Sequence, residues 1–309
     1  MNVLNLLNAM PGAIAQGLIW GIMAIGVYIT YKVLDLADLT VDGTMATGGA
    51  VCVMMMVSGH NVGVSLLVAF IVGCLAGLVT GVLHTALGIP AILAGILTQL
   101  GLYSVNLRIL DNKANQAINV DKYHLLVSLR YIKGVPFYKN TIFVVIIVIA
   151  LLVAALYWFF GTELGSAIRA TGSNLNMSRA QGINTNIMKV IGLVLSNGIV
   201  AFASGLYSQY QGFADVNAGR GAIVIGLAAV IIADVIFAKV KGNFAFKMAS
   251  VAVGAIIYYI VLQIVMWLGL NSNDLKLLSA IIVAGFLAVP YLKTKYAPKK
   301  VVSVSEEEE

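Results

Sequence analysis

A row of small polar side chains runs along the apolar segment at 187–211. Its members stand at alternating steps of four and three residues, and they are Asn197, Ala201, Ser204, Ser208 and Gln211. This spacing places all of them on one face of a helix. Because primary amides need hydrogen-bond partners where water is absent, the stripe predicts one of two roles: packing against a neighbouring helix, or lining a translocation path.

Asp42 is a second candidate for the same path. Together with Asp35 and Asp38, it interrupts the apolar pattern just before the run MATGGAVCVMMM. A carboxylate at the centre of a membrane-spanning helix costs about 2.5–3.5 kcal/mol on insertion scales. Two hypotheses follow. Asp42 lies at a helix break beside the path, or a helix begins here at the cytoplasmic interface, with Thr40 or Asp42 accepting its first free amides.

The chain lacks the motifs of catalysis. It has no G-x-x-x-x-G-K-[ST] loop for phosphates and no pattern typical of a serine, cysteine/histidine or paired-carboxylate centre. His60, His84 and His124 are far apart, with no cysteine or carboxylate at ligand spacing, so we expect no metal site. The sequence therefore predicts that the chain is not an enzyme and holds no cofactor of its own.

Composition indicates what must position these residues. Of the 309 residues, 60% are hydrophobic and 10% are charged, whereas soluble domains carry about 25% charged residues. Long uninterrupted apolar runs favour helices over a barrel, so we predict an all-α, polytopic integral membrane protein. About nine transmembrane or re-entrant helices are expected, within a range of about eight to ten. The segments are 12–31, 41–57, 62–87, 89–110, 141–160, 187–211, 220–239, 246–269 and 276–292.

The basic residues predict orientation rather than nucleic-acid binding. The formal net charge of +6 comes from Lys and Arg at segment ends and in loops. With the C-terminal KTKYAPKK in the cytoplasm, counting crossings backwards places the N-terminus outside. The same count puts Asp111–Asn140 outside despite its basic residues, which are Lys113, Lys122, Arg130, Lys133 and Lys139. This loop is a candidate docking site for an external binding protein.

Glycine spacing predicts a close helix contact. Gly73, Gly77 and Gly81 recur every four residues within one apolar segment. One face of that helix is therefore nearly bare, which allows a neighbouring helix to approach closely.

The stretch Gly161–Asn186, GTELGSAIRATGSNLNMSRAQGINTN, is a polar island between two long apolar segments. Glycines and capping residues divide it into two short amphipathic turns. Since it must lie outside the membrane, it touches either a soluble partner or the membrane surface, where its basic residues would meet anionic lipid.

This island resembles the cytoplasmic coupling loop of ABC importer permeases of the branched-chain amino acid and ribose class. The resemblance rests on the run ELGSAIRATGSN followed by SRAQGIN, and two further stretches, Leu36–Val51 and Gly226–Phe237, are similar to landmarks of that family. The run ADLTVDG resembles the corresponding sequence of a narrower branch of this family, the importers of tryptophan or other aromatic amino acids. The resemblance implies that the following residues couple the chain to an ATPase: Glu163, Gly165, Arg169, Ala170, Gly172, Asn174, Arg179, Gly182, Ile183 and Asn184.

The family implies a domain organisation and a set of partners. Residues 1–295 would form a transmembrane permease domain with its coupling loop at 161–186, and 296–309 a cytoplasmic tail. A separate ATPase would bind ATP and Mg²⁺, and an extracellular solute-binding protein would deliver a small solute, expected to be an amino acid. A second permease copy would complete a homodimer in the lipid of a prokaryotic cell membrane.

Two other function classes stay open. An ion-coupled secondary transporter would also be all-helical, although such proteins carry ionisable residues near the membrane centre. Asp234 lies only five residues before Lys239, which places it near the inner interface and disfavours that role. A channel or purely structural subunit would not need the glycine-punctuated island.

Overall fold

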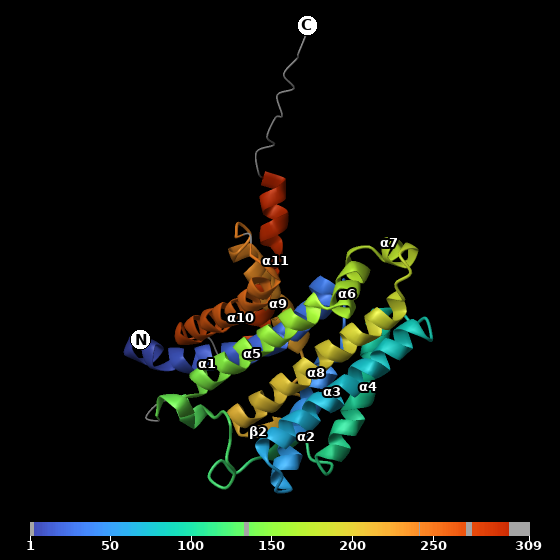
Figure 1. Ribbon diagram of the computed structural model, residues 1–309. Helices are drawn as coiled ribbons and strands as arrows, with labels where there is room; N and C mark the ends of the chain where they lie inside the picture. The colour runs from blue at the N-terminus through green and yellow to red at the C-terminus, as the bar shows by residue number, and fades with distance from the viewer. Residues whose placement is uncertain (1–2, 133–135, 241, 270–273, 297–309) are drawn as a thin grey trace.

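The computed structural model describes residues 3–132, 136–240, 242–269 and 274–296. Within these ranges nearly all regular structure is helical, which confirms the predicted all-α class (Figure 1). The helices are α1 (Val3–Tyr28), α2 (Thr40–Val57), α3 (Val62–Thr85), α4 (Ala91–Ile109), α5 (Thr141–Gly161), α6 (Glu163–Ser173), α7 (Leu175–Ala180), α8 (Thr185–Gln211), α9 (Ala222–Ile236), α10 (Phe244–Trp267) and α11 (Leu275–Tyr296). Shorter turns are η1 (Ile29–Val33), η2 (Leu129–Ile132) and η3 (Phe137–Lys139).

Seven of the described helices are long and apolar enough to cross a membrane. They include α1 with its extension η1, and the helices α2, α3, α4, α5, α8 and α10. The remaining two predicted segments correspond to shorter apolar helices at 222–236 and 277–286. The expected number of about nine complete crossings is therefore not confirmed. The predicted tail at 296–309 lies, apart from Tyr296, outside the described residues.

The bundle is built around α8. It packs against α1, α2 and α3, and the fit with α3 depends on the glycine face predicted from sequence. A Cβ at Gly73 or Gly77 would collide with the α8 backbone at Asn197 or Leu193, and Gly81 lies against Val190. With no side chain between them, the two helices contact through their backbones, as the four-residue spacing predicts.

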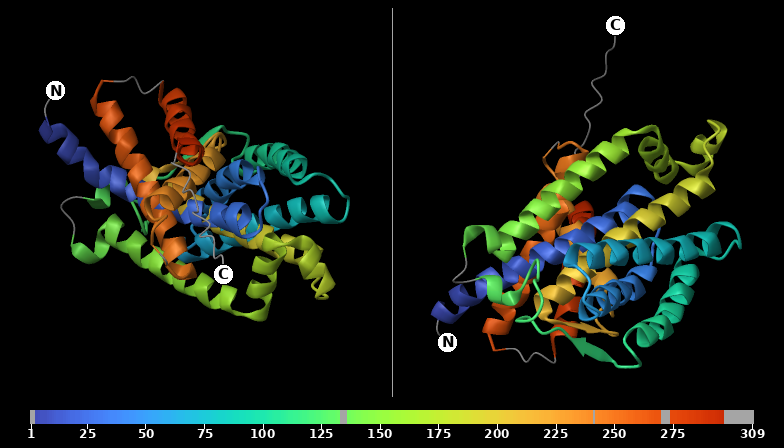
Figure 2. Two further views of the ribbon diagram at one scale, coloured as in Figure 1. Left: turned by 90° about the horizontal axis from the view of Figure 1, so that it is seen from above. Right: turned by 60° about the horizontal axis from the view of Figure 1, so that its bottom comes forward.

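The connections gather at two opposite ends of the bundle (Figures 1 and 2). At one end lie α6 and α7. At the other end lies the 111–140 connection, which carries β1 (Asn115–Ala117) antiparallel to β2 (Phe213–Asp215). This short ribbon, which sequence reasoning missed, ties the long connection to the end of α8. The Tyr123 hydroxyl also donates to the Val57 carbonyl at 3.3 Å.

Gly77 and Gly101 provide a matched test of the α3–α8 contact. Both lie inside spanning helices, but a Cβ at Gly77 would meet the Leu193 backbone, whereas one at Gly101 would meet open space. Gly→Ala in a helix is favourable by about 0.5–1 kcal/mol where there is room, and overpacking costs about 1–3 kcal/mol. Gly101→Ala should raise the melting temperature of the detergent-purified chain and Gly77→Ala should lower it. Equal shifts would contradict the close approach.

Candidate functional site

The polar island folds as two short helices, as predicted, because each helix start has a side-chain cap. The Thr162 hydroxyl accepts from the Gly165 amide at 3.3 Å and begins α6. The Asn174 side chain accepts from the Met177 amide at 3.0 Å and begins α7. The Asn184 side chain does the same for α8, accepting from the Ile187 amide at 3.2 Å. These caps satisfy amides that have no partner inside their own helices.

One face of α6 is fixed to the bundle. Ile168 and Thr171 are buried there, and a Cβ at Gly172 would collide with the backbone of Val33 and Leu34 at the end of η1. Gly165 is equally tight against the end of α5. Of the residues predicted to couple, these two glycines therefore point inward and position α6, and Ala170 and Ile183 are half-buried.

The opposite face of the island is open. The predicted residues exposed there are Glu163, Arg169, Asn174, Arg179, Gly182 and Asn184. Arg169 lies 5.6 Å from the centre of the Phe244 ring, a cation–π contact that holds the guanidinium near α10. Exposed apolar side chains share this surface, namely Leu164, Leu175 and Met177. Sequence reasoning missed them, although their place between the cationic residues was visible.

Asp42 lies at the junction of two helices. Its Oδ2 accepts from the Gly221 amide and its Oδ1 from the Ile223 amide, both at 2.9 Å. The hypothesis of a cap on its own helix is therefore wrong: Asp42 caps the start of α9, and Asp38 accepts from the Thr40 amide at 2.9 Å near the start of α2. Residues 35–39 form no helix and α2 begins at Thr40, so a helix start close to Asp42 agrees with both hypotheses, and the path role of Asp42 stays a prediction.

The α8 stripe lies against α2. The Asn197 amide donates to Asp38 Oδ2 at 2.7 Å, and its oxygen accepts from the Thr44 hydroxyl at 2.7 Å. The Ser204 hydroxyl donates to the Met45 carbonyl. These side chains are buried and their groups are paired, as the packing alternative requires.

Two stripe members lie apart from this polar network. Ser208 is buried beside Gly49, and Gln211 donates to the Tyr207 hydroxyl at 3.0 Å at the far end of α8. A path role of the stripe stays a prediction.

Asp38 is a buried, fully hydrogen-bonded carboxylate that sequence reasoning noted only as a helix breaker. Its side chain is 3% exposed, and both of its carboxylate oxygens accept hydrogen bonds. It adjoins a chain of hydroxyls in which Thr40, Thr80 and Thr98 are linked at 2.7 and 2.9 Å. An aspartate in the middle of the break LDLADLT was the available signal. Among the described residues, no three His, Cys, Asp or Glu side chains come together as they would to hold a metal ion.

Comparison with known proteins gives one family. Residues 10–289 match the family described as "Branched-chain amino acid transport system / permease component". The chain is 37% identical over 282 residues to a tyrosine transport system permease protein of Clostridioides difficile (strain R20291), covering 91% of each chain. It is 28% identical to the fructose import permease protein FruF of Bifidobacterium longum (strain NCC 2705), covering 80% of this chain and 67% of that one.

A solved structure shares the fold. It is titled "PsaBC from Streptococcus pneumoniae in complex with Fab", and it aligns with a TM-score of 0.54 at 14% identity. The alignment covers 95% of this chain and 100% of that one.

The Asn197 contacts predict a stability effect. Asn197→Leu removes one hydrogen bond to the buried Asp38 carboxylate and leaves the Thr44 hydroxyl without its partner. Leaving a buried polar group unpaired costs about 1–3 kcal/mol, and more for a charged group. The variant should melt at a lower temperature, whereas Gln211→Leu at the end of the stripe should change little. A stable Asn197→Leu protein that has lost transport would instead favour the path hypothesis.

Proposed function

The chain belongs to the family of branched-chain amino acid transport system permease components, and on this basis we propose that it carries an aromatic amino acid into a prokaryotic cell. It is a multi-pass membrane permease of an ABC importer. The observation that carries the choice of substrate is the 37% identity, over 91% of both chains, with a tyrosine transport system permease protein. A fructose permease lies further away at 28% identity.

A separate ATPase is proposed to dock on the open face of α6 and α7. Exposed Leu164, Leu175 and Met177 offer apolar contact area, and Arg169 and Arg179 supply charge around it. An apolar patch with a charged rim is typical of a protein-binding surface. The alternative occupant, anionic lipid, needs the cations but gives no role to the caps that fix α6 and α7 in one orientation.

Force applied to α6 has a direct route into the bundle. Gly172 packs α6 against the end of η1, and Lys32 of the same η1 forms an ion pair with Asp234 of α9 at 2.8 Å. The other end of α9 is held by Asp42. We propose that ATP-driven movement of α6 is transmitted through these contacts. The contacts must then differ between the two conformations of the importer, because a ligand shifts an equilibrium only between states that it binds differently.

The remaining partners follow from the same proposal. The end of the bundle that carries the 111–140 connection would face outward and receive a solute-binding protein, with the N-terminus on the same side and the C-terminus in the cytoplasm. Two copies of the chain would meet two ATPase subunits about a twofold axis. An ion-coupled carrier is not proposed, because the family assignment accounts for the chain without ion coupling.

Reconstitution tests the proposal. The permease is co-expressed with candidate ATPase and binding proteins of the same genome, purified and placed in liposomes. We expect a stable complex and ATP-dependent uptake of radiolabelled tyrosine or phenylalanine, with fructose excluded. Uptake of sugar alone would overturn the proposed substrate, and uptake in the absence of any ATPase would overturn the coupling.

Arg169 allows a sharper test of the docking surface. Arg169→Glu reverses the charge of the open face without filling the inward seat of α6, so uptake and stimulated ATP hydrolysis should fall about tenfold or more, as expected if close charge pairs with the partner are lost. Arg169→Lys should retain most activity, and Arg108→Glu, the same charge change at the end of α4, should be neutral. Normal uptake by Arg169→Glu would remove the α6 surface from the coupling site.

Cysteine labelling tests the proposed orientation of the chain in the membrane. In a protein without Cys52 and Cys74, single cysteines at Ser173 and Asn119 are treated with a membrane-impermeant reagent. Ser173 should react only from the cytoplasmic side and Asn119 only from outside. Labelling of Asn119 from the cytoplasm would reverse the assignment, in agreement with the positive charges of its loop.

A further inference from the structure

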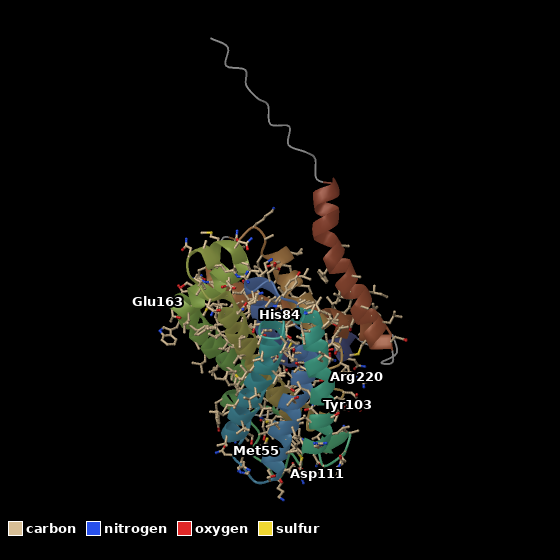
Figure 3. All side chains as sticks on the ribbon, turned by 90° about the vertical axis from the view of Figure 1, so that its right-hand side faces the viewer. Met55, His84, Tyr103, Asp111, Glu163 and Arg220 are labelled. Carbon is tan, nitrogen blue, oxygen red and sulfur yellow. The ribbon has the colours of Figure 1, made fainter. Side chains whose placement is uncertain are left out.

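A cavity of about 420 Å³ lies between α2, α4 and the turn that leads into α9. Its polar lining consists of Asp42, Gln99, Tyr103, Asn106 and Arg220. Figure 3 shows the labelled Tyr103 and Arg220 next to each other on the face that carries α4. The volume falls within the range of small-molecule sites, about 300–1,000 Å³, so an amino acid fits.

Three of the lining residues form one stripe of α4. Gln99, Tyr103 and Asn106 follow at steps of four and three residues, which places them on one helix face. Exposed apolar side chains cover much of the rest of α4, as expected for a lipid-facing surface, and they include Ile92, Leu93, Ile96 and Leu97. The polar stripe is therefore turned towards α2 and the α9 turn, away from lipid.

Asn106, in the lining of this cavity, carries a buried polar atom without a partner. The residue is 1% exposed, yet its Oδ1 atom has no hydrogen-bond partner among the described residues. By contrast, both side-chain groups of the buried Asn197 are paired. A buried acceptor without a partner loses its hydration and gains nothing in return. A donor brought by a ligand would satisfy it.

Of the two charged side chains that line the cavity, Asp42 has hydrogen-bond partners and Arg220 has no ion-pair partner among the described residues. Both Asp42 oxygens are occupied by α9 amides. The Arg220 side chain, in the part of the chain that the structure describes, has no ion pair. The cavity thus offers a free guanidinium for an anion, and an orphan amide oxygen with a carboxylate nearby for a cation.

We propose that this cavity binds the zwitterionic end of the transported amino acid. Arg220 binds the α-carboxylate in a charge-assisted contact, and Asn106 Oδ1 accepts from the α-ammonium, which also faces the negative Asp42. The Tyr103 ring, 42% exposed, borders the space for the substrate side chain. This inference rests on the proposed import of an amino acid and names the residues that recognise it.

Truncated substrates test each contact separately. The reconstituted importer takes up radiolabelled tyrosine in competition with tyramine, which lacks the carboxylate, and with 3-(4-hydroxyphenyl)propionate, which lacks the ammonium. Asn106→Leu should raise the KM for tyrosine about tenfold or more and lose the preference over the propionate. Arg220→Gln should raise KM similarly and lose the preference over tyramine. Arg108→Gln, on α4 outside the cavity, is the matched control.

Thermal stability separates recognition from folding. Replacing an unpaired buried amide with an apolar side chain of similar size removes a desolvation cost. Asn106→Leu should therefore melt at or above the wild-type temperature while its KM rises. A lower melting temperature with unchanged KM would make Asn106 a packing residue and overturn the proposal.

The outcomes distinguish a failure of the proposed binding site from a failure of the proposed transport function. Wild-type uptake of tyrosine together with unchanged KM and unchanged analogue preference in both variants would overturn the cavity and leave the importer intact. A wild-type complex that hydrolyses ATP but takes up no amino acid would overturn the proposed substrate, and the cavity assignment with it.

Discussion

The Asp42 carboxylate holds the start of α9, which is one of the two shorter apolar helices in the described part of the bundle. A helix that begins inside a membrane exposes amides that neither its own turns nor water can satisfy. Asp42 accepts from two amides at the start of α9, the Gly221 and Ile223 amides at 2.9 Å. The negative charge also matches the positive end of the helix dipole. With this cap in place, α9 needs only the 15 residues Ala222–Ile236 to reach its ion pair with Lys32.

A second buried carboxylate fixes the element that carries the first. Asp38 accepts from the Thr40 amide and from the Asn197 side chain, so the break before α2 is tied to the middle of α8. Asp35 adopts a left-handed backbone conformation at that break, with φ of 54°. The α8 stripe is therefore hydrogen-bonded to α2. This explains why polar residues at helical spacing are as typical of a helix–helix contact as of a translocation path. Only burial and partners separate the two interpretations.

Local patterns were predictable, and long-range partners were not. The apolar runs locate the spanning helices, the caps at Thr162 and Asn174 locate the island helices, the cap at Asn184 locates the start of α8, and the four-residue glycine spacing locates the α3 contact. Each of these depends on neighbours within a few residues. The partners of Asp42 are 179 and 181 residues away, and no single sequence contains that information. The polar stripe of α4 was visible as Gln99, Tyr103 and Asn106, but nothing local showed that one amide oxygen would be left unpaired.

The helix α9 joins the two regions to which we assign coupling and recognition. Its C-terminal end is joined to Lys32, beside the backbone on which Gly172 seats α6. Its N-terminal end carries the Asp42 cap, and Arg220 stands in the turn just before it. Between these two ends α9 packs against α1, α10 and α11, so a displacement at one end is passed along a helix that is held by its neighbours. If α6 couples to an ATPase as proposed, a shift imposed through α6 would alter the geometry around Asp42 and Arg220. The proposed binding cavity would then change its affinity for a bound solute without any direct contact between the solute and the ATPase.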